Sequence, residues 1–192
     1  MTTIYGLTGG VGMGKSSTTD CLRRLGLSVV DTDDLAKEIV RPGSPCFKEL
    51  IKVFGKSILT QEGNLNRRAL GDLVFSDSDQ RKILESILHP VIREKWKGQV
   101  QKWKEMRLKI GIVVIPLLFE THAQDEFHAV VSVACTSATQ MLRLSGRGWS
   151  REHCVERIQA QMTILEKMKR SDFVIWSEGT VACYEPQIRE IF

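Results

Sequence analysis

The sequence predicts an α/β fold in which a parallel β-sheet is flanked by helices. Residues 110–115 and 129–134 are continuous apolar runs, which are typical of strands buried on both faces of a parallel sheet. Segments with helical periodicity separate the apolar runs along the chain. A glycine-rich segment, residues 9–14, directly follows the first apolar run. The 192 residues correspond to about one domain, or to one domain with an insertion.

The N-terminal part predicts a strand, a glycine loop and a helix in that order. Residues 4–7 are apolar and compatible with a strand, and residues 14–25 have helical character with Gly26 as the C-terminal stop. Residues 27–30 form a second short apolar strand, which is followed by Asp31-Thr32-Asp33-Asp34.

Residues 35–105 predict a helical subdomain inserted between two strands. Phe47, Leu50, Ile51 and Phe54 recur at the spacing of one helix face. We expect Pro90 to begin a further helix, because proline is well tolerated at the first helical position. This stretch is too long for a simple crossover between neighbouring strands.

The C-terminal part returns to strands that alternate with helices. After the apolar runs at 110–115 and 129–134, helices are expected from Ser137 and from Ser150, the second continuing to Leu165. Gly146 and Gly148 lie between these helices as candidate hinges. A strand at residues 173–176 and a helix at residues 184–191 complete the prediction.

Composition and charge indicate which classes of protein this sequence can belong to. The sequence is 42% hydrophobic and 26% charged, as in globular proteins, and its longest apolar run is far shorter than a membrane span. The N-terminus has no signal-peptide pattern, and the five widely spaced cysteines suit free thiols, so we expect a cytoplasmic protein. Residues 137–170 carry the basic excess, which suggests contact with phosphates, although a solvated helix pair is the ordinary explanation.

The segment that determines the chemistry is the P-loop pattern G-x-x-x-x-G-K-[ST], which places the sheet among P-loop NTPase-type folds. Glycines let successive N–H groups turn towards phosphate oxygens, and the start of the following helix adds partial positive charge. Lysine reaches the β- and γ-phosphates, and the serine hydroxyl can ligate Mg²⁺. The predicted ATP-binding residues are Gly9, Gly10, Val11, Gly12, Met13, Gly14, Lys15, Ser16 and Ser17, with Ser16 as the metal ligand.

Asp31 and Asp33 form a second candidate group at the end of the second strand. Ligands bind beyond the carboxyl ends of parallel strands, where a carboxylate could accept a proton from an attacking hydroxyl. The alternative is that an aspartate caps the helix from Leu35. Asp34 suits the capping role, which leaves Asp33 as the candidate general base.

Arg143 and Arg147 form a third candidate group. Their spacing would place both guanidinium groups on one helix face, where they could bind phosphate oxygens and belong to a small helical lid that excludes water. A solvent-facing helix is the alternative.

Several segments together resemble the dephospho-coenzyme A kinase family: GLTGGVGMGKS, VVDTDDLAKEIVRPG, NRRALGDLVFSD, LHPVI, VVIPLLFE, QMLRLSGR, RIQAQM and SDFVI. They occur in family order and span nearly the whole chain. The resemblance implies ATP-dependent phosphorylation of the ribose 3′-hydroxyl of dephospho-coenzyme A, which yields coenzyme A and ADP.

The resemblance also implies three parts and a set of roles. Residues 1–34, 106–136 and 171–192 would form the nucleotide-binding core, residues 35–105 the helical acceptor-binding subdomain, and residues 137–170 the lid. Asp33 would be the general base, with Lys15 and Arg143 as further catalytic residues and Arg147 as a cofactor-binding residue. ATP, Mg²⁺ and dephospho-coenzyme A would be the ligands, with no nucleic-acid or membrane partner.

Two positions depart from the family pattern. Met13 replaces a small hydroxyl residue, and Ser177-Glu178-Gly179 replaces an Asn-containing turn near the adenine. A different small-metabolite kinase, or a P-loop switch or nucleic-acid-stimulated ATPase, are the alternative functions. The sequence does not indicate an oligomeric state.

Overall fold

The computed structural model describes the backbone of all 192 residues and every side chain except those of Phe75 and Ser76. The chain divides into two compact units. The first unit comprises residues 1–31 and 100–192, and the second comprises residues 32–99. Each unit has its own hydrophobic core.

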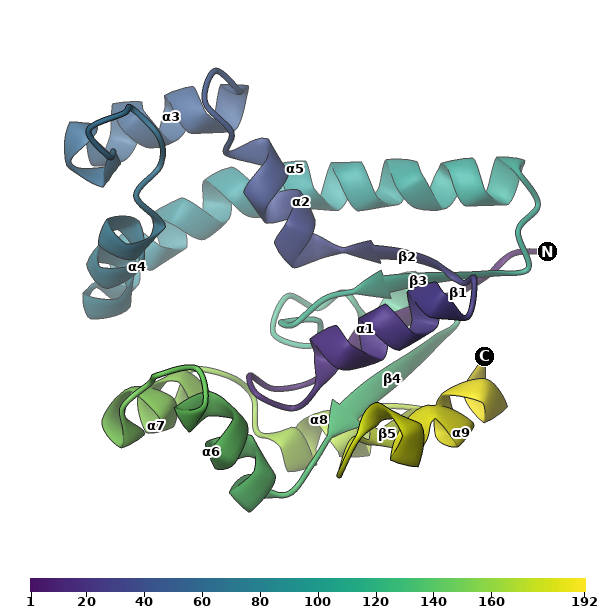
Figure 1. Ribbon diagram of the computed structural model, residues 1–192. Helices are drawn as coiled ribbons and strands as arrows, with labels where there is room; N and C mark the ends of the chain where they lie inside the picture. Colours follow the sequence, from purple (N-terminus) through teal and green to yellow (C-terminus); the bar gives the residue numbers. More distant parts are fainter. The chain divides into compact units, whose positions relative to one another are not determined.

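A five-stranded parallel sheet forms the centre of the first unit (Figure 1). Its strands are β1 (Thr3–Thr8), β2 (Ser28–Asp31), β3 (Ile110–Val114), β4 (Ala129–Ala134) and β5 (Phe173–Trp176). The strand order is β2-β3-β1-β4-β5, so β1 lies in the middle between β3 and β4. The predicted parallel sheet and its strands are therefore confirmed.

Helices α1 (Lys15–Arg24) and α9 (Val181–Ile191) pack together beside the sheet. Leu22, Ile112, Val133 and Ile188 are completely buried in the cluster that joins these elements. On β3, a Cβ atom at Gly111 would lie 2.3 Å from the Trp103 ring, so only glycine permits this close approach. The continuous apolar runs thus reflect strands that are covered on both faces.

Residues 137–170 form three short helices, α6 (Ser137–Ser145), α7 (Arg151–Gln159) and α8 (Ile164–Arg170). The side chains of Thr136, Ser150 and Thr163 each accept a hydrogen bond from the backbone N–H three residues later. These N-caps satisfy N–H groups that have no partner within the helix. A single helix from Ser150 to Leu165 is therefore wrong, because Thr163 caps a new helix.

The second unit is helical, with α2 (Thr32–Ile39), α3 (Pro45–Phe54), a 3₁₀ turn at Lys56–Ile58, α4 (Arg67–Ser76) and most of α5 (Ser78–Glu105). Leu50 and Ile58 are almost fully buried in its core. The predicted face of α3 is confirmed, since Phe47, Leu50 and Phe54 are all buried.

The expected helix start at Pro90 is wrong, because α5 runs without interruption through this residue. Proline removes one helical hydrogen bond, but here Pro90 is exposed. Leu88, Val91 and Ile92 pack against the same buried cluster before and after it. The continuous apolar stripe therefore outweighs the local preference of proline.

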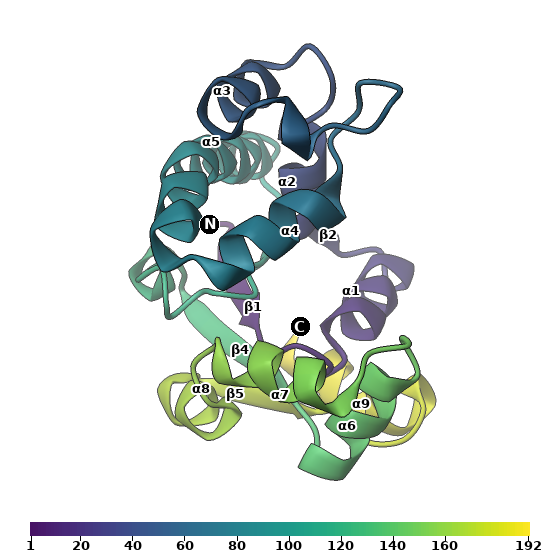
Figure 2. The same ribbon diagram turned by 90° about the vertical axis from the view of Figure 1, so that its left-hand side faces the viewer.

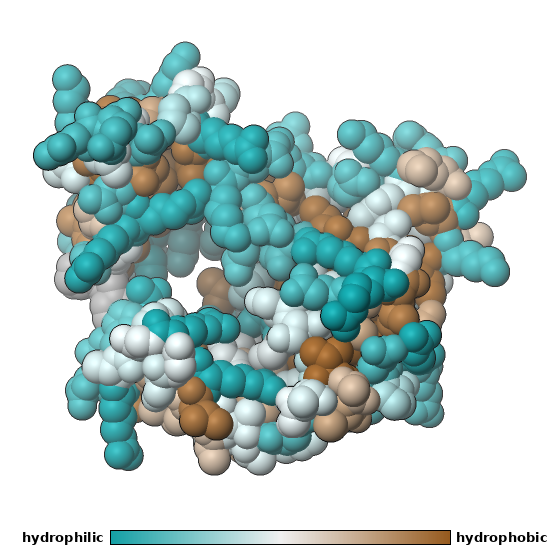
Figure 3. All heavy atoms as spheres, viewed as in Figure 1, coloured by the Kyte–Doolittle hydropathy of each residue, from teal (hydrophilic) through white to brown (hydrophobic). Residues whose placement is uncertain are grey.

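The remaining short element is a 3₁₀ turn at Gln124–Glu126 in the first unit. Hydrophilic side chains cover most of the surface visible in Figure 3, with hydrophobic side chains in smaller areas. None of the helices, within the described part of the chain, combines the length and apolar character needed to cross a membrane.

Candidate active site

The phosphate-binding loop leaves the carboxyl end of the central strand β1 and leads into α1. Gly9, Gly12 and Gly14 have positive φ angles, as the loop pattern requires. Gly14 has φ 93° directly before α1, and a Cβ atom there would lie 2.6 Å from Ser177 Oγ. Glycine is thus demanded at this position by both backbone conformation and space.

Lys15 lies across this loop. Its Nζ atom donates hydrogen bonds to the carbonyl oxygens of Gly9 at 2.6 Å and Gly10 at 2.8 Å. The predicted cation is therefore held by the loop that would surround a phosphate group. Ser16 and Ser17 are exposed in the first turn of α1, whose described residues include no side-chain N-cap and no first-turn acid. Such a helix start favours an anionic ligand.

Met13 contributes its main chain to the loop, while its side chain is buried beneath it. Its Sδ atom lies 3.3 Å from Cys135 N and 3.5 Å from Cys135 Sγ. Burial raises the pKa of the Cys135 thiol, which favours its neutral form beside the thioether. The departure from a small hydroxyl residue is accommodated because this side chain packs inwards.

Arg143 on α6 is connected to the same loop through Ser177. Its Nη1 and Nη2 atoms donate to Ser177 Oγ at 3.0 Å and to the Ser177 carbonyl oxygen at 2.5 Å. The Ser177 hydroxyl in turn donates to the Met13 carbonyl oxygen at 2.8 Å. The structure therefore brings Arg143 and Lys15 to one loop. The alternative, that Arg143 lies on a solvent-facing side of its helix, is wrong.

From the sequence, Ser177 was noted only as part of the Ser177-Glu178-Gly179 departure, and its contacts with Arg143 and the phosphate loop were not predicted. It is completely buried and directly follows β5. The available signal was its place immediately after a strand, at the carboxyl edge where P-loop proteins bind ligands. The neighbouring Glu178 accepts hydrogen bonds from Thr136 N and Thr139 Oγ1 at 2.6 and 2.7 Å. These bonds, led by the Thr136 N–H, lower the pKa of Glu178.

Arg147 does not share a helix face with Arg143, so that prediction is wrong. Helix α6 ends at Ser145, and Arg147 lies exposed in the turn that follows. Gly146 and Gly148 flank it, and Gly148 has φ 79°. The i, i+4 spacing fails as a guide because the helix ends between the two arginines.

Asp33 lies in the first turn of α2, two residues after the end of β2. Its side chain is exposed. The expected capping role of Asp34 is wrong, because α2 already begins at Thr32. Asp34 instead accepts a 2.8 Å hydrogen bond from Lys37 on the same helix.

The donor chemistry at the start of α1 suits Mg²⁺, since Ser16 offers an exposed hydroxyl oxygen beside Lys15. Mg²⁺ prefers oxygen ligands and retains several waters when it binds substrate phosphates, so one protein ligand is sufficient. Among the described side chains, no group of three or more histidines, cysteines and acids could hold a metal ion. A metal here would depend on the nucleotide.

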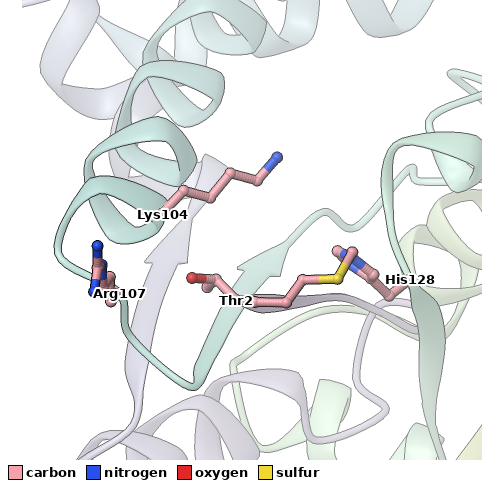
Figure 4. Close-up of a pocket in the computed structure, with 5 residues that line it drawn as sticks. Thr2, Lys104, Arg107 and His128 are labelled. Atoms are coloured by element: carbon pink, nitrogen blue, oxygen red, sulfur yellow. The ribbon is translucent and has the colours of Figure 1, made fainter.

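A separate hollow lies at the opposite, amino edge of the sheet (Figure 4). It has a volume of about 550 Å³ and is lined by Met1, Thr2, Lys104, Arg107 and His128. His128 Nδ1 accepts the Ile4 N–H at 3.0 Å, which fastens the start of β4 to β1. This contact gives His128 a structural role.

Comparison with known proteins agrees with the geometry. A family model described as dephospho-CoA kinase matches residues 3–182. A dephospho-CoA kinase of Bdellovibrio bacteriovorus is 44% identical over 170 residues, which cover 88% of this chain and 85% of the relative. One of Bacillus cereus is 37% identical over 192 residues, which cover 100% and 96%.

Solved structures agree with this relationship. The crystal structure of TT1252 from Thermus thermophilus has a TM-score of 0.85 and 32% identity, covering 99% of this chain and 96% of that one. Dephospho-CoA kinase from Campylobacter jejuni gives a TM-score of 0.72 at 27% identity, covering 100% and 96%. A shikimate kinase from Acinetobacter baumannii, at 11% identity and a TM-score of 0.52, shares the fold. The sequence and its phosphate-binding loop thus agree with the comparisons: this chain belongs to the dephospho-CoA kinase family.

Proposed function

We propose that Asp33, Lys15 and Arg143 carry out the family's reaction in this chain. The family phosphorylates dephospho-CoA with ATP in the final step of coenzyme A biosynthesis. In the proposed reaction, the ribose 3′-hydroxyl attacks the γ-phosphorus of ATP, the bond to the β-phosphate oxygen breaks, and ADP leaves. The observation that carries the assignment of Lys15 and Arg143 is their convergence on one phosphate loop, and Asp33 is assigned from its place after β2.

Lys15 and the start of α1 would bind the phosphates of ATP. Phosphoryl transfer needs positioning and stabilisation of negative charge that is spread over several oxygens. When ATP enters, its oxygens would replace the Gly9 and Gly10 carbonyls as partners of the Lys15 ammonium.

Arg143 would bind phosphate oxygens from the side of α6. Its guanidinium nitrogens already form two hydrogen bonds to Ser177, and one of them lies 3.1 Å from the Cβ position at Gly14. A guanidinium can bind two phosphate oxygens through two parallel N–H groups in a fixed planar arrangement, which a lysine ammonium does not have. We assign residues 137–170 as the lid, with Arg147 as a further, exposed phosphate ligand.

Asp33 would accept the proton of the attacking hydroxyl. It follows β2, whose carboxyl end lies at the same sheet edge as the loop because the strands are parallel. A general base in this role contributes about 10²–10⁴-fold to turnover. Residues 35–105 would bind dephospho-CoA, since they form the large helical insertion.

Ser16 would ligate Mg²⁺, which supplies neutralisation of phosphate charge when bound with ATP. We also propose a cytoplasmic location, which the five free cysteines support because disulfides are rare in a reducing compartment.

The acceptor assay tests the function directly. ADP release is measured with dephospho-CoA and with a panel of nucleosides and sugar acids, each at equal concentration with MgATP. We expect release with dephospho-CoA alone, with phosphate found on the ribose 3′-oxygen. Turnover of another acceptor, or ATP hydrolysis that nucleic acid stimulates, would overturn the proposal.

A further inference from the structure

Both backbone polar groups of Val11 in the phosphate loop are held by glutamine side chains. The Val11 N–H donates to Gln161 Oε1 at 2.9 Å, and the Val11 carbonyl oxygen accepts from Gln140 Nε2 at 2.7 Å. Gln140 belongs to α6, whereas Gln161 lies between α7 and α8. Two separate segments of residues 137–170 therefore form hydrogen bonds to one residue of the loop.

Gln140 is itself well fixed. It is 5% exposed and lies three residues before Arg143, so both side chains extend from one side of α6 towards the loop. Beside it, Leu144 approaches the Cβ position of Gly12 to 2.9 Å. Figure 2 shows α6 and α7 near the loop that leads into α1.

Gln161 is anchored through its neighbour. The Met162 N–H donates to Glu120 Oε1 at 2.9 Å, and Lys167, which is completely buried, forms an ion pair with Glu120 at 2.9 Å. Lys167 Nζ also donates to the Pro116 carbonyl oxygen at 2.7 Å. The segment carrying Gln161 is thus tied to the chain that follows β3.

We propose that Gln140 and Gln161 are positioning residues that fix the Val11 peptide groups and thereby link residues 137–170 to ATP binding. Val11 stands between Gly10 and Gly12, which restrict backbone rotation least of all residues. Without these two glutamines, the Val11 peptide groups would have to be ordered by the nucleotide itself. Ordering it in advance lowers the entropic cost of binding ATP.

Methionine substitutions provide the first test, because methionine keeps the length of glutamine and removes its hydrogen bonds. In Gln161→Met, we expect the Val11 amide hydrogen to exchange several-fold faster, measured by ¹⁵N NMR on the full chain. We expect Gln161→Met and Gln140→Met each to weaken binding of a non-hydrolysable ATP analogue by about 3–10-fold. The KM for dephospho-CoA should stay unchanged.

Gln159→Met is the matched control, because Gln159 is an exposed glutamine two residues from Gln161 at the end of α7. It should leave the Val11 exchange rate and analogue affinity unchanged. Unchanged Val11 exchange and analogue affinity in both test variants would overturn the proposal. An equal loss of affinity for the analogue and for dephospho-CoA would also overturn it, as would equal effects of Gln159→Met.

A charge-matched pair sharpens the test. Gln161→Glu keeps an oxygen that can accept the Val11 N–H, whereas Gln140→Glu places an oxygen against the Val11 carbonyl oxygen. Both variants add the same charge near the loop, so their difference reports the hydrogen bonds. We expect Gln140→Glu to bind the analogue about ten times more weakly than Gln161→Glu; equal affinities would contradict the proposal.

The inference rests on the proposed function only through the KM for dephospho-CoA. Amide exchange and analogue affinity need no turnover, and they test the two glutamines even if another acceptor is used. If the acceptor assay fails but the glutamine variants show the expected changes in Val11 exchange and analogue affinity, only the proposed function is overturned.

Discussion

The two edges of the parallel sheet both carry cations, but they use them differently. At the carboxyl edge, Lys15 and Arg143 are half-buried, and hydrogen bonds hold them within and beside the phosphate loop. At the amino edge, Lys104 and Arg107 line an open hollow and are exposed. Positive charge alone therefore does not distinguish the site.

The difference lies in preorganisation. The carboxyl edge adds the start of α1, the positive-φ glycines and the buried Ser177, which orient groups before a phosphate arrives. Electrostatic stabilisation is largest when the stabilising groups need no rearrangement during the reaction. Substitutions at the carboxyl edge should consequently change catalysis much more than substitutions at the amino edge.

The largest effect is expected for Asp33→Asn, which removes the proposed base from the chain that follows β2. Turnover should fall by about 10²–10⁴-fold while the affinity for ATP is retained. The measurement is steady-state ADP release together with calorimetric titration of an ATP analogue. Asp34→Asn is the control, because Asp34 is the adjacent exposed carboxylate and pairs with Lys37. Near-normal turnover in Asp33→Asn would remove Asp33 from the mechanism.

Lys15→Ala and Lys104→Ala compare the two edges directly. Lys15→Ala should weaken binding of the ATP analogue by about 10–100-fold, because a charge-assisted hydrogen bond to phosphate is lost. Lys104→Ala should bind the analogue with nearly the same affinity as the unsubstituted protein in the same titration. Similar losses in both variants would show that general positive charge, rather than the loop, binds the nucleotide.

Arg143→Ala should slow phosphoryl transfer by about tenfold and weaken ATP binding less. The reason is that the charge on the transferring group is spread most widely in the transition state. Single-turnover rates separate this step from binding and release. Arg147→Ala is the comparison within the lid and should have the smaller effect, since Arg147 lies beyond the end of α6. A change confined to ATP affinity in Arg143→Ala would contradict the catalytic role.

The sequence predicted the sheet and the loop well because each rests on short-range patterns. The strands at 129–134 and 173–176 match those of the structure, and residues 14–25 contain α1. The loop pattern combines glycines, a lysine and a serine over eight residues, so its geometry is local. Arg143 was found through its residue type, yet its partner Ser177 lies 34 residues away in the sequence.

The errors come from competition between local and long-range forces. Pro90 favours a helix start, but the buried apolar stripe of α5 continues through it. Arg147 has helical spacing from Arg143, but the helix ends first. Gln140 and Gln161 both bind the backbone of Val11. They lie 129 and 150 positions away from Val11 in the sequence, and no pattern within the sequence pairs them with it.

The smallest predicted effect concerns the support of the carboxyl edge by Glu178. Hydrogen bonds from Thr136 and Thr139 lower its pKa from the ordinary value of 4.5. A carboxylate whose pKa is lowered in the folded state stabilises the protein fully at pH values above its ordinary pKa. This stabilisation is lost as the pH falls through the folded-state pKa. Glu178→Gln cannot titrate, so it should lower Tm by roughly a few degrees at most at pH 7.

The difference in Tm between the two proteins should then shrink as the pH is lowered below 4.5. Thermal unfolding followed by circular dichroism between pH 7 and pH 3 (roughly the range over which carboxylates titrate) measures this convergence. Glu105→Gln is the comparison at the amino edge, since Glu105 is exposed at the end of α5 and accepts a hydrogen bond from the neutral Gln101 side chain. A constant Tm difference for Glu178→Gln across the pH range would show that the Glu178 carboxylate does not stabilise the start of α6.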